Sequence, residues 1–195
     1  MLYYSIFPGG DVFEKKRKKA QYVAHVPDRY EDYFSILNKG LEINRWDDSM
    51  ELSCLQSGEM DTLLANDKGW LIPSSILIKK FKEVGIKGIQ YLNITAIDKN
   101  GKKIIDYNTV ANIISAYDCI LKASSEVEYF GDEIPRLTGK IKKINKLILE
   151  QKKIGDADVF VLSDFFPRMI VSNKIYEIFK QNNFTGLSFE LVGVV

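Results

Sequence analysis

The chain has few of the residues on which several protein classes depend. Its 195 residues include two cysteines, one histidine and five prolines, and 27 Lys and Arg nearly balance 26 Asp and Glu. Cys54 and Cys119 lie far apart in the sequence, which excludes a disulfide scaffold and favours reduced core thiols in a cytoplasmic protein. The formal charge of +1 lacks the basic field typical of nucleic-acid-binding proteins. We therefore expect an ordinary globular protein with no nucleic-acid partner.

Long hydrophobic runs are also missing. The apolar start of the chain has no preceding basic region and stops at Pro8, so it does not fit a signal peptide. The longest apolar stretch, residues 110–121, is interrupted by Asn112, Ser115 and Asp118. It is shorter than the roughly 20 apolar residues that a membrane helix needs. We expect no membrane association.

The usual motifs of catalysis and cofactor binding are absent. His25 is the sole histidine, so no cluster of histidines can bind a metal, and no G-x-S-x-G turn surrounds a serine. Glycine-rich dinucleotide and phosphate loops are missing as well. The sequence thus predicts no metal, nucleotide or covalent cofactor and no essential role for His25. An enzyme with a carboxylate-based site assembled from distant residues stays open.

The first 60 residues are rich in aromatic side chains. They hold nine of the 23 aromatic residues, and their pattern predicts a strand over residues 2–7 and a helix over 27–39. A run of basic residues at 15–19 is typical of a solvated loop. We expect residues 1–60 to form an irregular α+β region packed on a main body formed by residues 61–195.

Two segments of the main body resemble each other at an offset of 98 residues. Residues 71–94 align without a gap on residues 169–192, matching Ser74 with Ser172 and Phe81 with Phe179. Each serine stands where a helix N-cap belongs, and each copy has an apolar helix stripe followed by Gly85 or Asn183 at the helix end. We predict two strand–helix–strand units, with helices starting near the two serines and packing on a shared mixed sheet. Duplication and independent use of the same capping rules are both compatible with the alignment.

The remaining patterns complete an α+β prediction. Asn100 and Gly101 predict a type I′ hairpin turn between residues 89–97 and 102–107. Residues 108–119 and 159–162 are typical of buried strands, and 140–150 of a strand or short helix. The predicted fold class is therefore α+β: a mixed sheet with two similar strand–helix–strand units and an irregular, aromatic-rich N-terminal region.

One segment combines negative charge with aromatic side chains. Gly131 and Pro135 within it predict an exposed loop. Aromatic residues beside charges are typical of surfaces that bind a protein partner, although the same residues also occur in ordinary loops. The candidate partner-binding residues are Glu126, Glu128, Tyr129, Phe130, Asp132 and Glu133.

Several segments together resemble a known family. They are Tyr3-Tyr4, LIPSSILIKKFKEVGIKGIQYL, YNTVANIISAYDCI and, above all, KINKLILEQKKIGDADVFVLSDFFPRMIVSNKIYEIFKQNNFTGLSFELV. In these segments the chain resembles a family of bacterial polymorphic-toxin immunity proteins, typified by a myxobacterial protein and formerly a domain of unknown function.

The resemblance implies a non-enzymatic cytoplasmic protein that binds and neutralises one cognate toxin domain in the producing cell. Two other functions stay open at this point. One is the small cytosolic enzyme with a carboxylate-based site, and the other is an accessory scaffold protein of a mobile element. The sequence leaves homo-oligomerisation and the toxin's activity undetermined.

Overall fold

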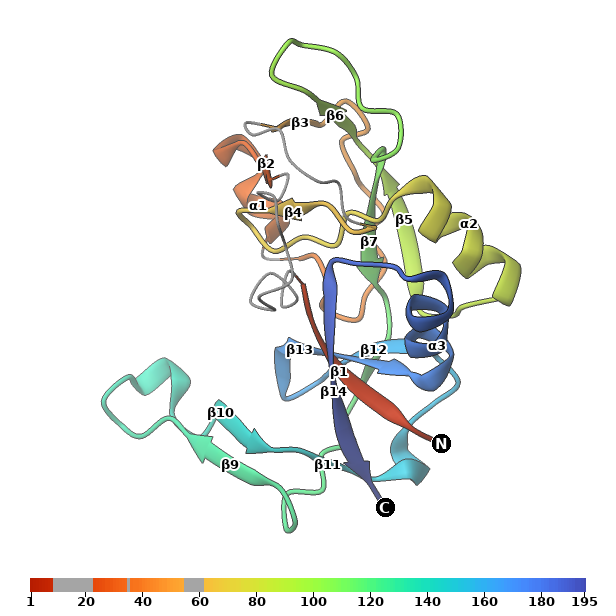
Figure 1. The fold of residues 1–195 in the computed structure, drawn as a ribbon. Helices are drawn as coiled ribbons and strands as arrows, with labels where there is room; N and C mark the ends of the chain where they lie inside the picture. The colour runs from red at the N-terminus through yellow and green to blue at the C-terminus, as the bar shows by residue number, and fades with distance from the viewer. Residues whose placement is uncertain (9–22, 35, 55–61) are drawn as a thin grey trace, which may run out of the picture.

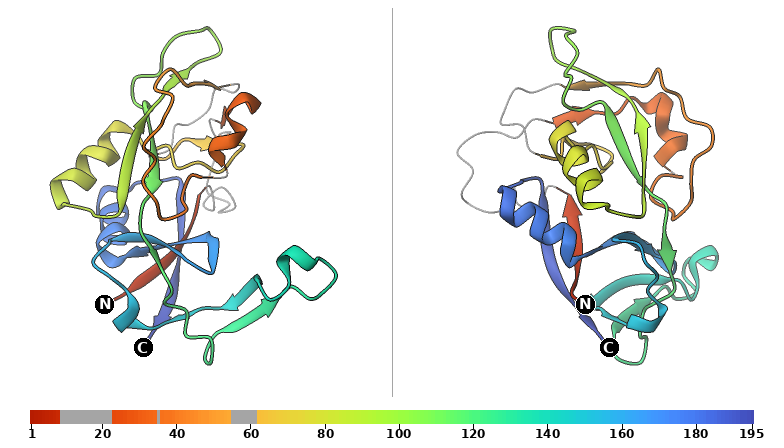
Figure 2. Two further views of the ribbon diagram at one scale, coloured as in Figure 1. Left: turned by 180° about the vertical axis from the view of Figure 1, so that it is seen from behind. Right: turned by 90° about the vertical axis from the view of Figure 1, so that its right-hand side faces the viewer.

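The computed structural model describes residues 1–8, 23–34, 36–54 and 62–195 (Figure 1). The basic run predicted at 15–19 lies outside these residues. Within them the longer helices are α2 (Ser75–Val84) and α3 (Asn173–Asn182), which lie one above the other on the same side of the molecule (Figures 1 and 2). The shorter helical segments are α1 (Glu31–Phe34), η2 (Asp28–Tyr30), η3 (Pro135–Leu137) and η4 (Gln151–Lys153).

A six-stranded mixed sheet forms the lower half of the view in Figure 1. Its inner strands are antiparallel, and a parallel neighbour closes each edge. Because β1 pairs with β14, the two ends of the chain lie side by side. In spatial order the strands are β11 (Ile148–Leu149), β14 (Leu187–Val194), β1 (Tyr3–Pro8), β13 (Phe165–Ser172), β12 (Val159–Leu162) and β8 (Ala116–Tyr117).

The remaining strands form three smaller sheets. The α+β class and the mixed strand pairing agree with the prediction. The division of the chain at residue 60 stays a prediction. The four-stranded sheet contains β4 (Ala65–Asn66), β2 (Val23–His25), β3 (Glu51–Cys54) and β6 (Thr95–Ile97). The two-stranded sheets are β5 (Ile89–Asn93) with β7 (Thr109–Ile113), and β9 (Glu126–Tyr129) with β10 (Ile141–Lys146).

Three hydrophobic clusters form the core. One packs the four-stranded sheet against aromatic residues of the N-terminal region, a second lies under α2 and α3, and a third lies between the six-stranded sheet and β10. Cys54 and Cys119 are buried free thiols, as expected. Burial raises the pKa of Cys54 to about 11 and that of Cys119 to about 12.

Two local predictions were wrong. The predicted helix over 27–39 is limited to η2 and α1, and Asn38 adopts a left-handed conformation with φ 56°. Its side chain accepts a hydrogen bond from the Ile113 N–H (2.9 Å), which ties this turn to β7. The hairpin after β6 does not continue as a second strand, because residues 102–107 form only one bridge, from Lys103 to Ile97. Strand β5 pairs with β7 instead.

The turn in that hairpin also differs from type I′. Among its residues only Gly101 has a positive φ, at 78°. The Asp98 carboxylate accepts hydrogen bonds from the Asn100 and Lys102 N–H groups, both at 2.8 Å. These bonds hold the pKa of Asp98 below its usual value. The side chain of Asp98 therefore selects a longer turn than the Asn-Gly pair alone favours.

Helices α2 and α3 begin directly after Ser74 and Ser172, as predicted, and Phe81 and Phe179 are both buried. Neither serine hydroxyl makes a capping hydrogen bond, however, so the serines mark the helix starts without capping them. The sheets also differ from the prediction: β14 belongs to the six-stranded sheet, whereas β7 is the one partner of β5 among the described strands. Before α2, residues 71–73 form an isolated bridge rather than a named strand.

The segments around the two helices nevertheless make equivalent backbone hydrogen bonds. The Ser74 N–H donates to the Thr62 carbonyl and the Ser172 N–H to the Asp158 carbonyl, each at 2.8 Å. Tyr91 on β5 faces Ala111 on β7, as Phe189 on β14 faces Ile6 on β1. We call residues 62–64, 71–93 and 109–113 the α2 unit. Residues 3–8, 158–162 and 169–194 are the α3 unit.

The two units contact each other reciprocally. The Lys87 N–H of the α2 unit donates to the Asp158 carboxylate (3.1 Å), and the Thr185 N–H of the α3 unit donates to Thr62 Oγ1 (3.0 Å). Lys87 and Thr185 are equivalent positions at the 98-residue offset, and both stand just before a glycine. Such an exchange of equivalent contacts is what a two-fold axis produces between identical surfaces. The second hydrophobic cluster lies between the two units.

Candidate functional site

The predicted partner-binding residues lie on a hairpin that extends away from both units (Figures 1 and 2). Glu126, Glu128 and Tyr129 belong to strand β9, and the prediction of a loop was wrong for them. They form a strand because β9 pairs antiparallel with β10, whose buried Ile141 and Ile144 attach the hairpin to the core. We call residues 126–146 the β9–β10 hairpin.

The hairpin exposes most of the predicted residues. Glu126, Glu128, Asp132 and Glu133 are exposed, Tyr129 is 46% exposed and Phe130 is half-buried. The structure thus brings these side chains together on one projecting element, although Asp132 and Glu133 lie beyond the paired part of β9.

Sequence reasoning missed the charges opposite these acids. Lys143 on β10 pairs in register with Glu128 on β9, and Lys146 pairs with Glu126. At these positions β10 is therefore positively charged and β9 negatively charged. Asn145 also donates to the Glu128 carboxylate at 2.6 Å. Lys142 lies over the Phe130 ring, with 5.9 Å from its ammonium nitrogen to the ring centroid. The hairpin therefore presents alternating charges rather than an acidic surface.

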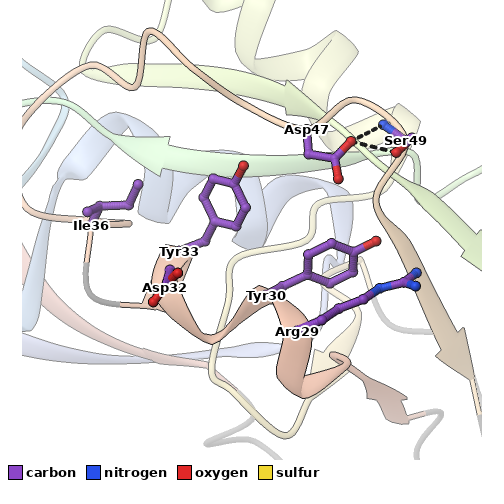
Figure 3. Close-up of a pocket in the computed structure, with 7 residues that line it drawn as sticks. All are labelled: Arg29, Tyr30, Asp32, Tyr33, Ile36, Asp47 and Ser49. Carbon is purple, nitrogen blue, oxygen red and sulfur yellow. Dashed lines mark hydrogen bonds between the residues drawn. The ribbon is translucent and has the colours of Figure 1, made fainter.

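A second candidate surface is an open hollow of about 780 Å³ beside α1 (Figure 3). The Arg29 guanidinium lies over the Tyr30 ring, 4.8 Å from its centroid. Asp47 accepts hydrogen bonds from the Ser49 hydroxyl and N–H, which lower the pKa of its carboxyl group. The lining residues are Arg29, Tyr30, Asp32, Tyr33, Ile36, Asp47 and Ser49.

This hollow combines exposed charge with aromatic side chains from the N-terminal region. Tyr33 packs against Trp46 at a ring-centroid distance of 4.7 Å, so its ring is anchored from the side of the core. The hollow is wide and open, which suits a protein surface better than a small substrate. It is the alternative to the β9–β10 hairpin as a contact surface.

His25 contacts the Asp67 carboxylate. Its Nδ1 lies 2.5 Å from Asp67 Oδ2, and the Val26 N–H donates to the other oxygen of Asp67 at 3.0 Å. Partial burial opposes ionisation of Asp67, but these hydrogen bonds hold its pKa below the usual value. That His25 is dispensable stays a prediction.

Among the described residues, no group of three or more His, Cys, Asp and Glu side chains is placed to hold a metal ion. The helices in the same part of the chain are all too short or too polar to cross a membrane.

Comparison with known proteins identifies one family. The search of curated proteins returned no match. In contrast, the family described as the immunity protein family (Imm11) matches residues 9–194, nearly the whole chain. This match includes the α2 unit, the α3 unit except β1, the β9–β10 hairpin and the hollow beside α1. The chain belongs to the Imm11 immunity protein family.

Proposed function

We propose that this protein binds and neutralises a cognate polymorphic toxin domain in the cytoplasm of the producing cell, without catalysing a reaction. The observation that carries the proposal is the family match over residues 9–194. An inhibitor needs a surface complementary to its target, and the protein offers the projecting β9–β10 hairpin.

The hairpin is the contact surface that we favour. Tyr129 on β9 is nearly half exposed, and its partner Ile141 on β10 is buried. The Tyr129 ring is therefore exposed on a strand that the core holds in place. Phe130 is half-buried beneath Lys142, which limits the rotamers that it loses on binding. Tyr is enriched among the residues that dominate binding energy, and rigid aromatic side chains supply contact area at a low entropic cost. We assign Tyr129 and Phe130 as anchors.

The carboxylates of Glu126, Glu128, Asp132 and Glu133 then surround the anchors. Because Lys143 and Lys146 oppose two of them, the net field of the hairpin is weak and cannot alone attract a strongly basic toxin. We expect these acids to select the partner through local pairing. Their effect on the association rate should be small above about 0.15 M salt, where the screening length is about 8 Å.

The proposal can be tested by expressing this chain with the variable C-terminal domain of a secreted protein encoded next to it. We expect the chain to restore growth and to co-purify with that domain. Replacing Tyr129 and Phe130 by Ala should weaken binding by about 2 kcal/mol, roughly thirtyfold. Calorimetry on the purified pair measures this effect, and near-ultraviolet circular dichroism checks the fold.

Two control variants separate the candidate surfaces. Ile105→Ala removes an apolar side chain that is 81% exposed outside both of them and should leave the affinity unchanged. The double variant Arg29→Ala, Ile36→Ala alters the hollow beside α1. Loss of binding in this variant, with full affinity in the hairpin variant, would transfer the contact surface to the hollow. Full toxicity despite a folded chain would contradict the neutralising function itself.

A further inference from the structure

A groove beside the loop end of the paired strands β9 and β10 gathers positive charge around one aromatic ring. Two hollows, of about 410 and 270 Å³, share Phe166 as a lining residue. We call them together the Phe166 groove. Residues that line it include Lys39, Lys68, Lys122, Lys140, Phe166 and Trp70.

The charges in this groove are unbalanced. Asp164 is the one acidic side chain among the described lining residues, and it pairs with Lys122 at 2.7 Å. Lys68 contacts Asp28 at 3.4 Å, outside the lining. Lys39 and Lys140 form no ion pair with any described residue, so two ammonium groups are left to bind an anion.

Lys39 is held in place before any partner binds. Its neighbour Asn38 exchanges hydrogen bonds with β7: the Asn38 N–H donates to Asn112 Oδ1 and the Ile113 N–H donates to Asn38 Oδ1, both at 2.9 Å. Asn112 is fully buried and also donates to the Leu41 carbonyl. This network fixes the backbone on both sides of Lys39. Its ammonium nitrogen lies 5.1 Å from the centroid of the Phe166 ring.

A second aromatic residue, Trp70, belongs to the same lining. Trp70 is 3% exposed, and its indole N–H makes no hydrogen bond with the described residues. Because this N–H is enclosed, Trp70 offers a partner part of its ring and not the donor. The groove thus combines cations with an aromatic surface.

We propose that the Phe166 groove binds an acidic, extended segment of the partner protein, with carboxylates at Lys39 and Lys140 and an apolar side chain on Phe166. This inference rests on the proposed function, because the family indicates a protein partner. A nucleic acid could satisfy the lysines as well. We favour the peptide because the formal charge of the whole chain is only +1, which provides little attraction for a phosphate backbone.

The test uses a fluorescent peptide of Asp and Glu with one central Phe, and measures its anisotropy with the full chain. We expect salt-dependent binding. The double variant Lys39→Glu, Lys140→Glu should weaken it at least about tenfold, since each substitution turns an attraction into a repulsion. Phe166→Ala should weaken binding about tenfold while preserving its salt dependence.

The matched control is Lys99→Glu, which makes the same charge change at an exposed site outside the groove. It should bind the peptide as the natural chain does. The inference is overturned if the peptide does not bind, if Lys99→Glu weakens it equally, or if a single-stranded oligonucleotide binds the groove more tightly than the peptide.

Assays with the toxin separate this inference from the proposed function. If the natural chain protects cells and the Lys39→Glu, Lys140→Glu variant protects equally with unchanged affinity, the groove proposal fails while neutralisation stands. If the natural chain gives no protection, the proposed function fails whatever the peptide result. Reduced toxin affinity in the variant, with affinity retained in Lys99→Glu, supports both.

Discussion

The α2 unit and the α3 unit share a backbone plan but differ in how completely it is paired. In the α3 unit, β12, β13, β1 and β14 form a continuous antiparallel part of the six-stranded sheet. In the α2 unit, the segment equivalent to the end of β13 is no named strand: it forms the bridge between Leu63 and Pro73 and donates or accepts single backbone hydrogen bonds on either side. Proline has no N–H to donate, and Pro73 stands where the α3 unit has Val171.

The buried polar groups are also less completely hydrogen-bonded in the α2 unit than in the α3 unit. Asp158, the residue before β12 in the α3 unit, accepts a hydrogen bond from the Ser172 hydroxyl at 2.9 Å and forms an ion pair with Lys174. The equivalent position in the α2 unit is Thr62, and the buried Ser74 hydroxyl has no partner among the described residues. The α2 unit therefore keeps the shared backbone arrangement although its strands are less completely paired. The α3 unit and the hydrophobic cluster between the two units stabilise it.

The largest difference is expected from truncating the equivalent phenylalanines. Phe179 is 3% exposed and contacts Phe184 and Phe189 at ring-centroid distances of 5.9 and 5.3 Å, whereas Phe81 is 8% exposed. Phe179→Ala should lower the free energy of unfolding by about 5 kcal/mol and Phe81→Ala by about 3 kcal/mol. Urea denaturation measures both values. Equal losses would mean that the two helices pack equivalently despite their different sheets.

The second comparison concerns the glycines that bring the two units into contact. A Cβ atom at Gly88 would lie 2.3 Å from the Val159 carbonyl oxygen, and one at Gly186 would lie 2.9 Å from Leu63 Cβ. Both residues also have positive φ, at 99° and 97°. Gly88→Ala should cost about 4 kcal/mol and Gly186→Ala about 3 kcal/mol, the sum of backbone strain and overpacking.

Gly101→Ala is the control for these two variants, because it combines a positive φ of 78° with open space around the new atom. It should cost only about 1 kcal/mol. A thermal or urea unfolding series that places all three variants at the same cost would show that strain alone matters. The reciprocal contact between the units would then carry no energy of its own.

The local parts of this fold could be predicted from the sequence. The starts of both helices, the αL residues Gly85 and Asn183 at their ends, and strand β12 depend on residues a few positions apart. Val84 continues the apolar spacing of Leu77 and Phe81, yet it is 43% exposed, so the buried part of the stripe ends at Phe81. The spacing of apolar residues predicts which face of a helix is buried, but not the residue at which that burial ends.

Nonlocal pairing could not be predicted in the same way. Strand β7 follows β5 in the chain, whereas its counterpart β1 lies at the opposite end of the chain from β14, so a fixed offset does not align them. The candidate hairpin shows the same limit. Its acids were visible in the sequence, but Lys143 and Lys146 oppose them only in a register interrupted by two irregularities. Charge complementarity across strands depends on that register.

A smaller difference between the units is expected from the two serines. Ser172→Ala removes a buried hydrogen bond to Asp158 and leaves the carboxylate with fewer donors, so it should cost about 1 to 2 kcal/mol. Ser74→Ala removes a buried hydroxyl that has no partner among the described residues, so its cost should be within about 0.5 kcal/mol of zero. Urea denaturation with unchanged slopes measures both. A loss in Ser74→Ala equal to that in Ser172→Ala would contradict the difference between the units.

A transplant sharpens this comparison. The position equivalent to Asp158 is Thr62, and the position equivalent to Lys174 is Ile76, which is 60% exposed. The double variant Thr62→Asp, Ile76→Lys gives the α2 unit the groups that surround Ser172: an acceptor for the Ser74 hydroxyl and the Thr185 N–H, and a cation beside that acceptor. We expect a gain of about 1 kcal/mol, because a charged hydrogen bond is added where the hydroxyl is already buried. In this background Ser74→Ala should become costly, whereas an unchanged neutral effect would show that the two units differ at this corner in more than their side chains.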